Sequence, residues 1–294
     1  MRKPVIWFDG EATRTLIGGS RIPRGEWVKA KPSLLRSLTP GILKAKGVFE
    51  TMRARKGKVD LLKVHLQRMS RGLKVLDLTP PKLLFTIRKQ ISKLLKINRL
   101  KNARVRVMVW QKGSRRYCAI IAGPLQAPTA GQYSKGFKAM LTNGHRRQTP
   151  VPVKSLDYKI FRESLQKARA AGVDEALLVN RKGELVEGSR TNIFLVKDNC
   201  LLTPPVTSGC LPGVMRQTVL DGARRLKIRC APQMLRAQDL FEADEAFLTN
   251  ALIGIMPLTS VNRRAIGTGK PGPVTRRLRK AYQSLYRLNY GLKK

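Results

Sequence analysis

The first half of the chain carries two amphipathic helical patterns. Over residues 61–77 five apolar residues fall on one face of a helix: Leu62, Leu66, Met69, Leu73 and Leu76. Pro80-Pro81 ends this pattern, since proline cannot continue a helix. A second amphipathic pattern covers residues 82–97. The spacing therefore predicts two consecutive helices, each with one buried face.

Alternating apolar and polar positions predict strands around these helices. Val105, Val107 and Val109 alternate with more polar neighbours, as expected of a half-buried strand. Residues 117–122 are its predicted hairpin partner. Residues 48–52 form another predicted strand, and a first strand at 5–8 is closed by the turn Asp9-Gly10.

A stretch rich in proline, glycine and serine divides the chain. We predict a smaller N-terminal α/β domain over 1–123, an interdomain linker over 124–134, and a larger domain over 135–294. Helices are predicted at 156–171, from after Gly213 to about 226, and at 273–288. Short strands are predicted at 137–142, 175–179, 184–186, 191–196, 200–203 and 246–249. The fold class is therefore α+β, with antiparallel strands prominent in the second half.

Composition is typical of an enzyme core with an unusual surface. Hydrophobic residues make up 42% of the chain, which excludes a disordered polycation. No apolar run approaches the roughly 20 residues of a membrane helix, and the apolar N-terminal stretch is too short for a signal peptide. None of the four cysteines forms a C-x-x-C pair, and two histidines argue against a zinc site. We expect free thiols and a cytoplasmic location.

The chain carries 59 Lys and Arg against 18 Asp and Glu, a net charge of +41. The cations run evenly from Arg2 to Lys294, which favours a scaffold whose surface has been engineered to be positively supercharged. An evolved nucleic-acid function and an unusually basic proteome or partner stay open. In each case we expect salt-sensitive, non-specific binding to nucleic acid or anionic surfaces, because aromatic residues total only 6% and offer no stacking platform.

The remaining acids suggest which positions matter. Glu50, Asp157, Glu187, Asp244 and Glu245 all lie inside motifs that carry candidate chemistry. We therefore hypothesise that the retained acids have defined partners. The hypothesis fails if most of the eighteen acids lie on exposed surface without a partner.

Three segments point to chemistry. Lys154 lies between the apolar run 150–153 and a predicted helix start, where partial desolvation makes it a plausible Schiff-base amine. Glu187 precedes the turn and strand 188–194. Pro212-Gly213 opens a helix, whose first backbone N–H groups are suited to a phosphate.

Five segments, in this order and spacing, resemble the fold type IV pyridoxal-phosphate enzymes. They are Gly47–Arg53 with His65–Arg68, the region of Lys154, Glu187–Phe194, Leu211–Gln217 and Thr249–Leu258. That family includes branched-chain and D-amino-acid aminotransferases and 4-amino-4-deoxychorismate lyase. The resemblance implies a D-amino-acid-aminotransferase-like fold, pyridoxal 5'-phosphate in the cleft between the domains, a small carboxylate or amine substrate, and a homodimer. Because +41 per chain opposes association, we expect that dimer to depend on salt.

The same resemblance implies residue roles. Lys154 would form the Schiff base and shuttle protons at the substrate carbon, and Glu187 would pair with the pyridine nitrogen. Arg68 would bind the cofactor phosphate. The remaining implied contacts are Val214 and Met215 (phosphate, through the helix start), Asn250 and Ala251 (its other side), Tyr158 (ring hydroxyl) and Leu211 (ring face).

Two stretches resemble the lyase more than the aminotransferases. They are Gly213–Gln217, similar to G-I-M-R-Q, and Ala243-Asp244-Glu245 with Thr249–Leu252. We therefore expect release of pyruvate and 4-aminobenzoate from 4-amino-4-deoxychorismate, with a branched-chain or D-amino-acid aminotransferase as the alternative. A cationic scaffold that binds nucleic acid non-specifically, with or without enzymatic activity, is an alternative of another class.

One departure leaves the substrate open. The lyase and the D-amino-acid enzymes have an arginine before glycine after the strand 105–109, whereas this chain has Trp110-Gln111-Lys112-Gly113. Arg53, Gln111 and Arg115 are the candidate substrate contacts.

Overall fold

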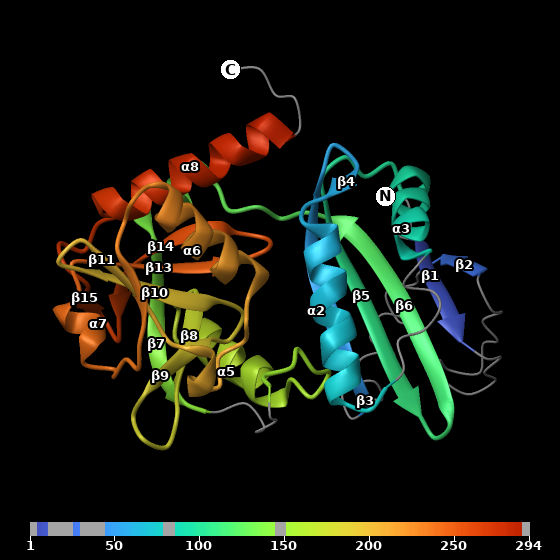
Figure 1. The fold of residues 1–294 in the computed structure, drawn as a ribbon, viewed down its shortest axis with the longest axis horizontal. Helices are drawn as coiled ribbons and strands as arrows, with labels where there is room; N and C mark the ends of the chain where they lie inside the picture. Colours follow the sequence, from blue (N-terminus) through green and yellow to red (C-terminus); the bar gives the residue numbers. More distant parts are fainter. Residues whose placement is uncertain (1–4, 11–25, 30–44, 79–85, 145–150, 290–294) are drawn as a thin grey trace. The chain divides into compact units, whose positions relative to one another are not determined.

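The computed structural model describes residues 5–10, 26–29, 45–78, 86–144 and 151–289, and they form two compact units (Figure 1). Unit 1 comprises residues 1–126 and 153–158, and unit 2 comprises 127–152 and 159–294. The break after Gln126 falls inside the stretch predicted as a linker. The last part of that stretch belongs to helix α4 (Ala130–Lys135), whose start is fixed by a capping box between Thr129 and Gln132.

Unit 1 is built on an antiparallel sheet. In spatial order its strands are β2 (Glu26–Lys29), β1 (Val5–Gly10), β6 (Arg115–Pro124), β5 (Ala103–Lys112), β3 (Lys46–Arg55) and β4 (Lys58–Val59). The predicted hairpin is the pair β5–β6, in which Val107 faces Ile120. Strand β3 pairs with the other edge of β5 and places Phe49 opposite Met108.

Two helices cover one face of this sheet. Helix α2 (Leu62–Val75) packs on β3, and helix α3 (Ile87–Ile97) packs against β1 and β6 (Figure 1). The core between them and the sheet contains the apolar stripes expected from the helical spacing. Its members include Met69 and Leu73 of α2, Ile87, Ile91 and Leu94 of α3, and Val105, Val107 and Val109 of β5.

The segment 153–158 returns to unit 1 and extends its sheet. Its backbone joins the free edge of β3, where Phe49 N donates to Lys154 O at 3.0 Å and Leu156 N donates to Gly47 O at 2.9 Å. Position 47 must be glycine, because a Cβ there would lie 2.5 Å from Val109 O of β5 and 2.7 Å from Leu156 Cδ1 of this segment. Lys154 is thereby fixed to a strand of unit 1, although the helix that follows it belongs to unit 2.

Unit 2 contains a larger mixed sheet. Along the sheet its strands are β12 (Cys230–Pro232), β11 (Cys200–Thr203), β10 (Asn192–Lys197), β13 (Glu245–Asn250), β14 (Gly254–Val261), β7 (Phe137–Asn143), β8 (Glu175–Val179) and β9 (Leu185–Gly188), and β15 (Arg264–Ala265) pairs with β14. The pairs β11–β12, β14–β7 and β7–β8 are parallel, and the other pairs are antiparallel.

Helices pack on this sheet. Helix α5 (Lys159–Ala170) packs on β7 and β8, while α6 (Val214–Arg225) and α8 (Pro273–Asn289) pack on each other and on β13. The short elements are η2 (Val206–Ser208) and α7 (Asp239–Glu242). Strand β14 was not predicted, because Gly254 and Pro257 interrupt its pattern; in the structure Pro257 pairs with Phe247 inside the sheet.

The α+β class with antiparallel strands is confirmed. All four cysteines are free. Among the described helices, none combines the length and the apolarity needed to cross a bilayer. The described residues also contain no group of three or more His, Cys, Asp or Glu side chains that could hold a metal ion.

Candidate active site

Lys154 lies beside two aromatic rings of unit 1. Its Nζ is 4.6 Å from the ring centroid of Phe49 and 5.6 Å from that of Tyr158. The two rings meet edge to face, with centroids 5.4 Å apart. Tyr158, predicted to contact the cofactor ring, thus lies near Lys154 within the same unit. The rings remove part of the solvent around the amine and restrict its direction.

Arg106 of strand β5 lies against the same ring of Phe49, with its Cζ 4.3 Å from the centroid. Its Nε is buried and donates to no acceptor within the described part of the chain. Burial and the neighbouring charge of Arg104 lower the pKa of Arg106 to about 10, although Tyr158 acts in the opposite direction. The guanidinium is therefore charged at neutral pH. A cation with an unused buried donor is suited to an anionic ligand.

Sequence reasoning missed Arg106. It alternates with Val105 and Val107, so that pattern alone assigned it to a solvent-facing side of β5. Only the strand pairing reveals it, because Arg106 lies opposite Thr51, two residues along β3 from Phe49.

Arg68, predicted to bind the cofactor phosphate, holds a buried carboxylate. Its Nε donates to Glu50 Oε1 and its Nη2 to Glu50 Oε2, both at 2.7 Å, and His65 Nδ1 lies 2.8 Å from Glu50 Oε2. Burial alone would raise the pKa of Glu50, but Arg68 and His65 lower it to about 2. Adjacent residues of a strand face opposite sides, so this cluster lies across the sheet from Phe49. The phosphate role of Arg68 stays a prediction.

Glu187 of strand β9 is buried in unit 2 and fixes a neighbouring backbone. Its Oε2 accepts a hydrogen bond from Leu211 N at 3.0 Å. Asn192 Nδ2 donates to Leu211 O at 2.9 Å. The predicted residues Glu187 and Leu211 are therefore brought together. Asn192, which was not predicted as a site residue, binds the carbonyl oxygen of Leu211.

A second buried carboxylate, Glu175, holds the loop that joins Glu187 to Asn192. It accepts hydrogen bonds from Ser189 Oγ, from Thr191 Oγ1 at 3.1 Å and from Ala176 N at 3.0 Å. Burial raises the pKa of Glu175, against the lowering effect of Arg190 and these hydrogen bonds. Glu175 was read only as the start of a strand, and nothing in its local pattern marks its long-range partners.

The start of helix α6 presents backbone donors that the helix itself does not use. Gly213 is its N-cap and supplies no side-chain cap, and Val214 and Met215 are the first helical residues. The first N–H groups of any helix have no acceptor within the helix, so they are available to an anion. Gly213 also has to be glycine, because a Cβ there would collide with Asn192 Oδ1. The phosphate role of Val214 and Met215 stays a prediction.

Asn250 organises the turn between β13 and β14. Its Oδ1 accepts from Leu252 N at 2.9 Å and Ile253 N at 3.0 Å, and its Nδ2 donates to Arg190 O at 3.1 Å. Ala251 lies in the same turn and is half-buried. Asn250 is therefore tied to the loop that Glu175 holds, through Arg190 O.

The three candidate substrate contacts are less informative. Arg53 is half-buried on β3, opposite Arg104. Gln111 Nε2 donates to Gly113 O at 2.8 Å and stabilises the β5–β6 turn. The side chain of Arg115 lies outside the described residues. Their substrate roles stay predictions.

Each unit, taken by itself, carries groups whose chemistry suits a phosphorylated aldehyde cofactor. Unit 1 has a lysine amine beside aromatic rings. Unit 2 has a buried carboxylate, and a helix start whose N–H groups suit a phosphate. The profile of the Amino-transferase class IV family matches residues 47–261, which is more than half of the chain. The chain belongs to the class IV aminotransferases. Enzymes of this family depend on pyridoxal phosphate, act on small amino and keto acids, and are typically oligomeric.

Branched-chain aminotransferases are prominent among the relatives of this class IV aminotransferase. It is 31% identical to a putative branched-chain-amino-acid aminotransferase of Methanocaldococcus jannaschii, over 92% of this chain and 96% of that protein. It is 27% identical to the branched-chain-amino-acid aminotransferase of Escherichia coli K12, over 96% of this chain and 92% of that one.

Solved structures agree. The fold matches the Escherichia coli branched-chain enzyme with a TM-score of 0.80 at 26% identity, over 97% of this chain and 95% of that one. A branched-chain enzyme from T.th., solved with pyridoxamine 5'-phosphate, matches with a TM-score of 0.79 at 26% identity, over 97% and 94%. The fold type IV architecture is thus confirmed, and so is the pyridoxal-phosphate cofactor.

The comparisons bear on three expectations. The relatives favour the aminotransferase alternative over the lyase, and they lend no support to nucleic-acid binding or to a redesigned surface. The lyase-like residues have structural partners in this chain, so they do not discriminate between the two reactions. Arg216 donates to Pro204 O, Asp244 accepts from Asp198 N, and Glu245 accepts from Val274 N and Thr275 N. Such contacts serve either reaction.

Proposed function

We propose that this protein is a pyridoxal-phosphate-dependent aminotransferase that moves the amino group of a branched-chain L-amino acid to a keto acid. Relatives along nearly the whole chain bear this name. The observation that supports it most is the pair of cationic groups around one apolar ring, with Lys154 Nζ at 4.6 Å and Arg106 Cζ at 4.3 Å from the Phe49 centroid.

Lys154 has the role of proton carrier in this proposal. Bound pyridoxal phosphate withdraws electrons from the α-carbon of the substrate. Lys154 Nζ would take the proton from the α-carbon and deliver it to the aldehyde-derived carbon of the cofactor, and not back to the α-carbon, as transfer of the amino group requires. Its backbone bonds to β3 and its ring neighbours support this role, because they limit where the amine can point.

Arg106 is the proposed receptor for the substrate carboxylate. Its Nε donor is buried and unused among described residues, so a carboxylate there would gain a charge-assisted hydrogen bond. The apolar ring of Phe49 beside it suits an aliphatic substrate side chain better than a charged one. This pairing of a cation and an apolar surface matches a branched-chain amino acid.

Glu187 and helix α6 are the proposed contacts to the cofactor itself. A buried carboxylate opposite the pyridine nitrogen keeps that nitrogen protonated. The N–H groups at Val214 and Met215, with the positive end of the helix dipole, would take up phosphate charge. Leu211 N and Asn192 support this arrangement by fixing the backbone between the two.

The test compares amino donors at one enzyme concentration. The cofactor-loaded protein is incubated with 2-oxoglutarate and leucine, isoleucine or valine, and glutamate is measured. D-Valine tests the D-amino-acid alternative, and 4-amino-4-deoxychorismate tests the lyase through 4-aminobenzoate and pyruvate. Glutamate from the L-amino acids alone supports the proposal. Formation of 4-aminobenzoate with no glutamate would overturn it.

A further inference from the structure

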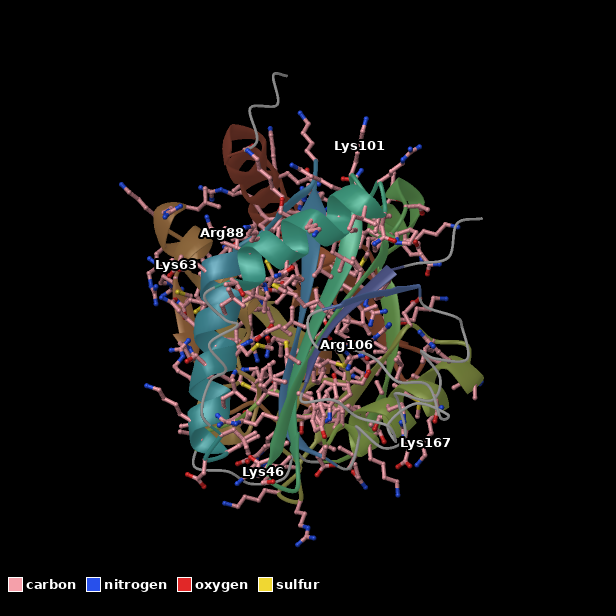
Figure 2. All side chains as sticks on the ribbon, turned by 90° about the vertical axis from the view of Figure 1, so that its right-hand side faces the viewer. Lys46, Lys63, Arg88, Lys101, Arg106 and Lys167 are labelled. Atoms are coloured by element: carbon pink, nitrogen blue, oxygen red, sulfur yellow. The ribbon has the colours of Figure 1, made fainter. Side chains whose placement is uncertain are left out.

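Arg216 is a cation held inside unit 2, unlike the surface cations of this chain. Lys46, Lys63 and Lys101 of unit 1 are exposed and lie at the periphery of that unit in Figure 2. Arg216, near the start of helix α6, is only 6% exposed, less than any other lysine or arginine whose side chain the structure describes. Because a buried charge costs free energy unless it is compensated, this guanidinium needs a partner.

Arg216 has no acidic partner in the described part of the chain. Its Nη2 donates to Pro204 O at 2.9 Å, which satisfies one donor with a neutral acceptor. Its Nε is buried and has no acceptor among the described residues, and no described Asp or Glu forms an ion pair with it. One carbonyl oxygen does not offset a buried positive charge. The side chain is therefore suited to an anion that comes from outside the chain.

The position of Arg216 relates this charge to the start of α6. Val214 is the first helical residue and Arg216 the third, so their backbones are about 3 Å apart along the helix axis. Helical side chains lean towards the N-terminal end, and the hydrogen bond to Pro204, which precedes the helix, agrees with that direction. The guanidinium thus adds a full charge to the N–H groups and the dipole at the helix start.

The same hydrogen bond fixes the segment that leads into α6. Arg216 holds this segment at Pro204 O. At its other end Leu211 N donates to Glu187 Oε2 at 3.0 Å, and Asn192 Nδ2 donates to Leu211 O at 2.9 Å. The segment between Pro204 and Leu211 is therefore held at both ends within unit 2. Arg216 connects the helix start with the backbone that Glu187 binds.

We propose that Arg216 is a positioning residue for the phosphate end of the cofactor. Its buried charge adds to the attraction that the N–H groups of Val214 and Met215 offer, and its bond to Pro204 O holds the helix start in a fixed relation to Glu187. This role rests on the proposed function, which supplies the phosphate, but it does not depend on which amino acid is the substrate.

The test separates the phosphate from the rest of the cofactor. The full-length protein is freed of cofactor, and the dissociation constants of pyridoxal 5'-phosphate and of pyridoxal, which lacks the phosphate, are measured by absorption. The ratio of the two constants measures what the phosphate contributes. Arg216→Gln keeps an amide donor and removes the charge, whereas Arg216→Lys keeps the charge. Arg225→Met removes an exposed charge from the last turn of α6 and is the matched control.

We expect Arg216→Gln to lower this ratio about tenfold or more, because a hydrogen bond to a charged group contributes on that order. Pyridoxal should bind Arg216→Gln within about threefold of its affinity for the unsubstituted protein, since it has no phosphate to lose. Arg216→Lys should keep most of the ratio, and Arg225→Met should keep all of it.

Four results would overturn the proposal. They are an unchanged ratio in Arg216→Gln, an equal loss of both ligands, an equal fall of the ratio in Arg216→Lys and Arg216→Gln, and an Arg216→Gln chain that does not fold by circular dichroism. The second and the fourth would make Arg216 a structural brace only. If leucine gives no glutamate while the ratio depends on the charge of Arg216 as expected, only the proposed function fails.

Discussion

Lys154 and Glu187, the two proposed charged partners of the cofactor, are held by different physical means. Lys154 belongs to a backbone segment that extends the edge of β3, and its amine lies over the rings of Phe49 and Tyr158. Glu187 accepts a backbone N–H from Leu211 at the end of a strand, and the loop after it is held by the buried Glu175. Unit 1 thus uses a strand and aromatic rings, whereas unit 2 uses a hydrogen-bonded loop.

The difference teaches where each kind of group needs support. A lysine that transfers protons must keep its amine movable, and ring faces direct a cation without a fixed bond. A carboxylate that must stay ionised opposite a ring nitrogen needs a fixed position and a defined set of donors. Single substitutions can test the movable lysine of unit 1 and the fixed carboxylate of unit 2 separately, because each one changes a group in one unit only.

The largest effect is expected from Lys154→Ala. It removes the amine that carries the proton, so kcat should fall by more than about a thousandfold. The visible absorption of the bound cofactor should disappear, and borohydride reduction should no longer leave a phosphopyridoxyl label on the peptide around position 154. Lys159→Ala, an exposed lysine five positions on, is the control and should keep both signals. Full activity in Lys154→Ala would refute the role given to this residue.

The next largest effect is expected at the buried carboxylate Glu50, which Arg68 and His65 hold. Glu50 has a pKa of about 2 in the folded protein, below its ordinary value of about 4.5. It therefore stabilises the fold above pH 4.5, by about 3 kcal/mol, and loses that contribution as the pH falls towards 2. Urea unfolding of Glu50→Gln should show a deficit of this order at neutral pH that shrinks on acidification.

Glu175 should behave in the opposite sense. Burial raises its pKa, so its ionised form costs stability, and that cost appears as the pH rises through the folded-state pKa.

A deficit for Glu50→Gln that stayed constant between neutral pH and about pH 3 would show that packing, and not charge, explains it. Glu163→Gln, on the exposed side of α5, should have little effect at any pH.

Glu187→Gln tests the carboxylate of unit 2 directly. The amide keeps the shape of the side chain and an oxygen for Leu211 N, but it cannot hold a proton on the ring nitrogen by charge. We expect the variant to bind cofactor and to lose about a hundredfold in kcat. Glu184→Gln, which changes the turn before β9, should keep its turnover. Loss of cofactor in Glu187→Gln would instead indicate that its main role is structural.

Much of the fold could be predicted because local pattern and tertiary packing agree. The apolar spacing of α2 and the alternation in β5 predicted elements whose buried faces the structure confirms. Strand β14 was missed, since Gly254 and Pro257 argue against a strand and only pairing with β13 overrides them. Local propensity does not contain that information.

The site was predicted unevenly for a similar reason. Lys154 and Glu187 lie in short segments that resemble a known family, so they were identified without a structure. Arg106 and Glu175 depend on contacts with residues far along the chain, and each looks like an ordinary strand position in isolation. Other acidic residues also have partners that local sequence does not reveal, since Glu50, Glu245 and Asp174 all accept hydrogen bonds from residues distant in the chain.

The smallest catalytic effect is expected from Arg106→Met, and it decides whether unit 1 also recognises the substrate. Removing the guanidinium leaves the carboxylate of leucine without its charged partner, so KM should rise about tenfold with a smaller change in kcat. Arg104→Met, an exposed arginine two positions away on the same side of β5, is the matched control. Equal KM values in both variants would move substrate recognition to another residue. A rise confined to Arg106→Met would place the carboxylate receptor on β5, in the same unit as Lys154.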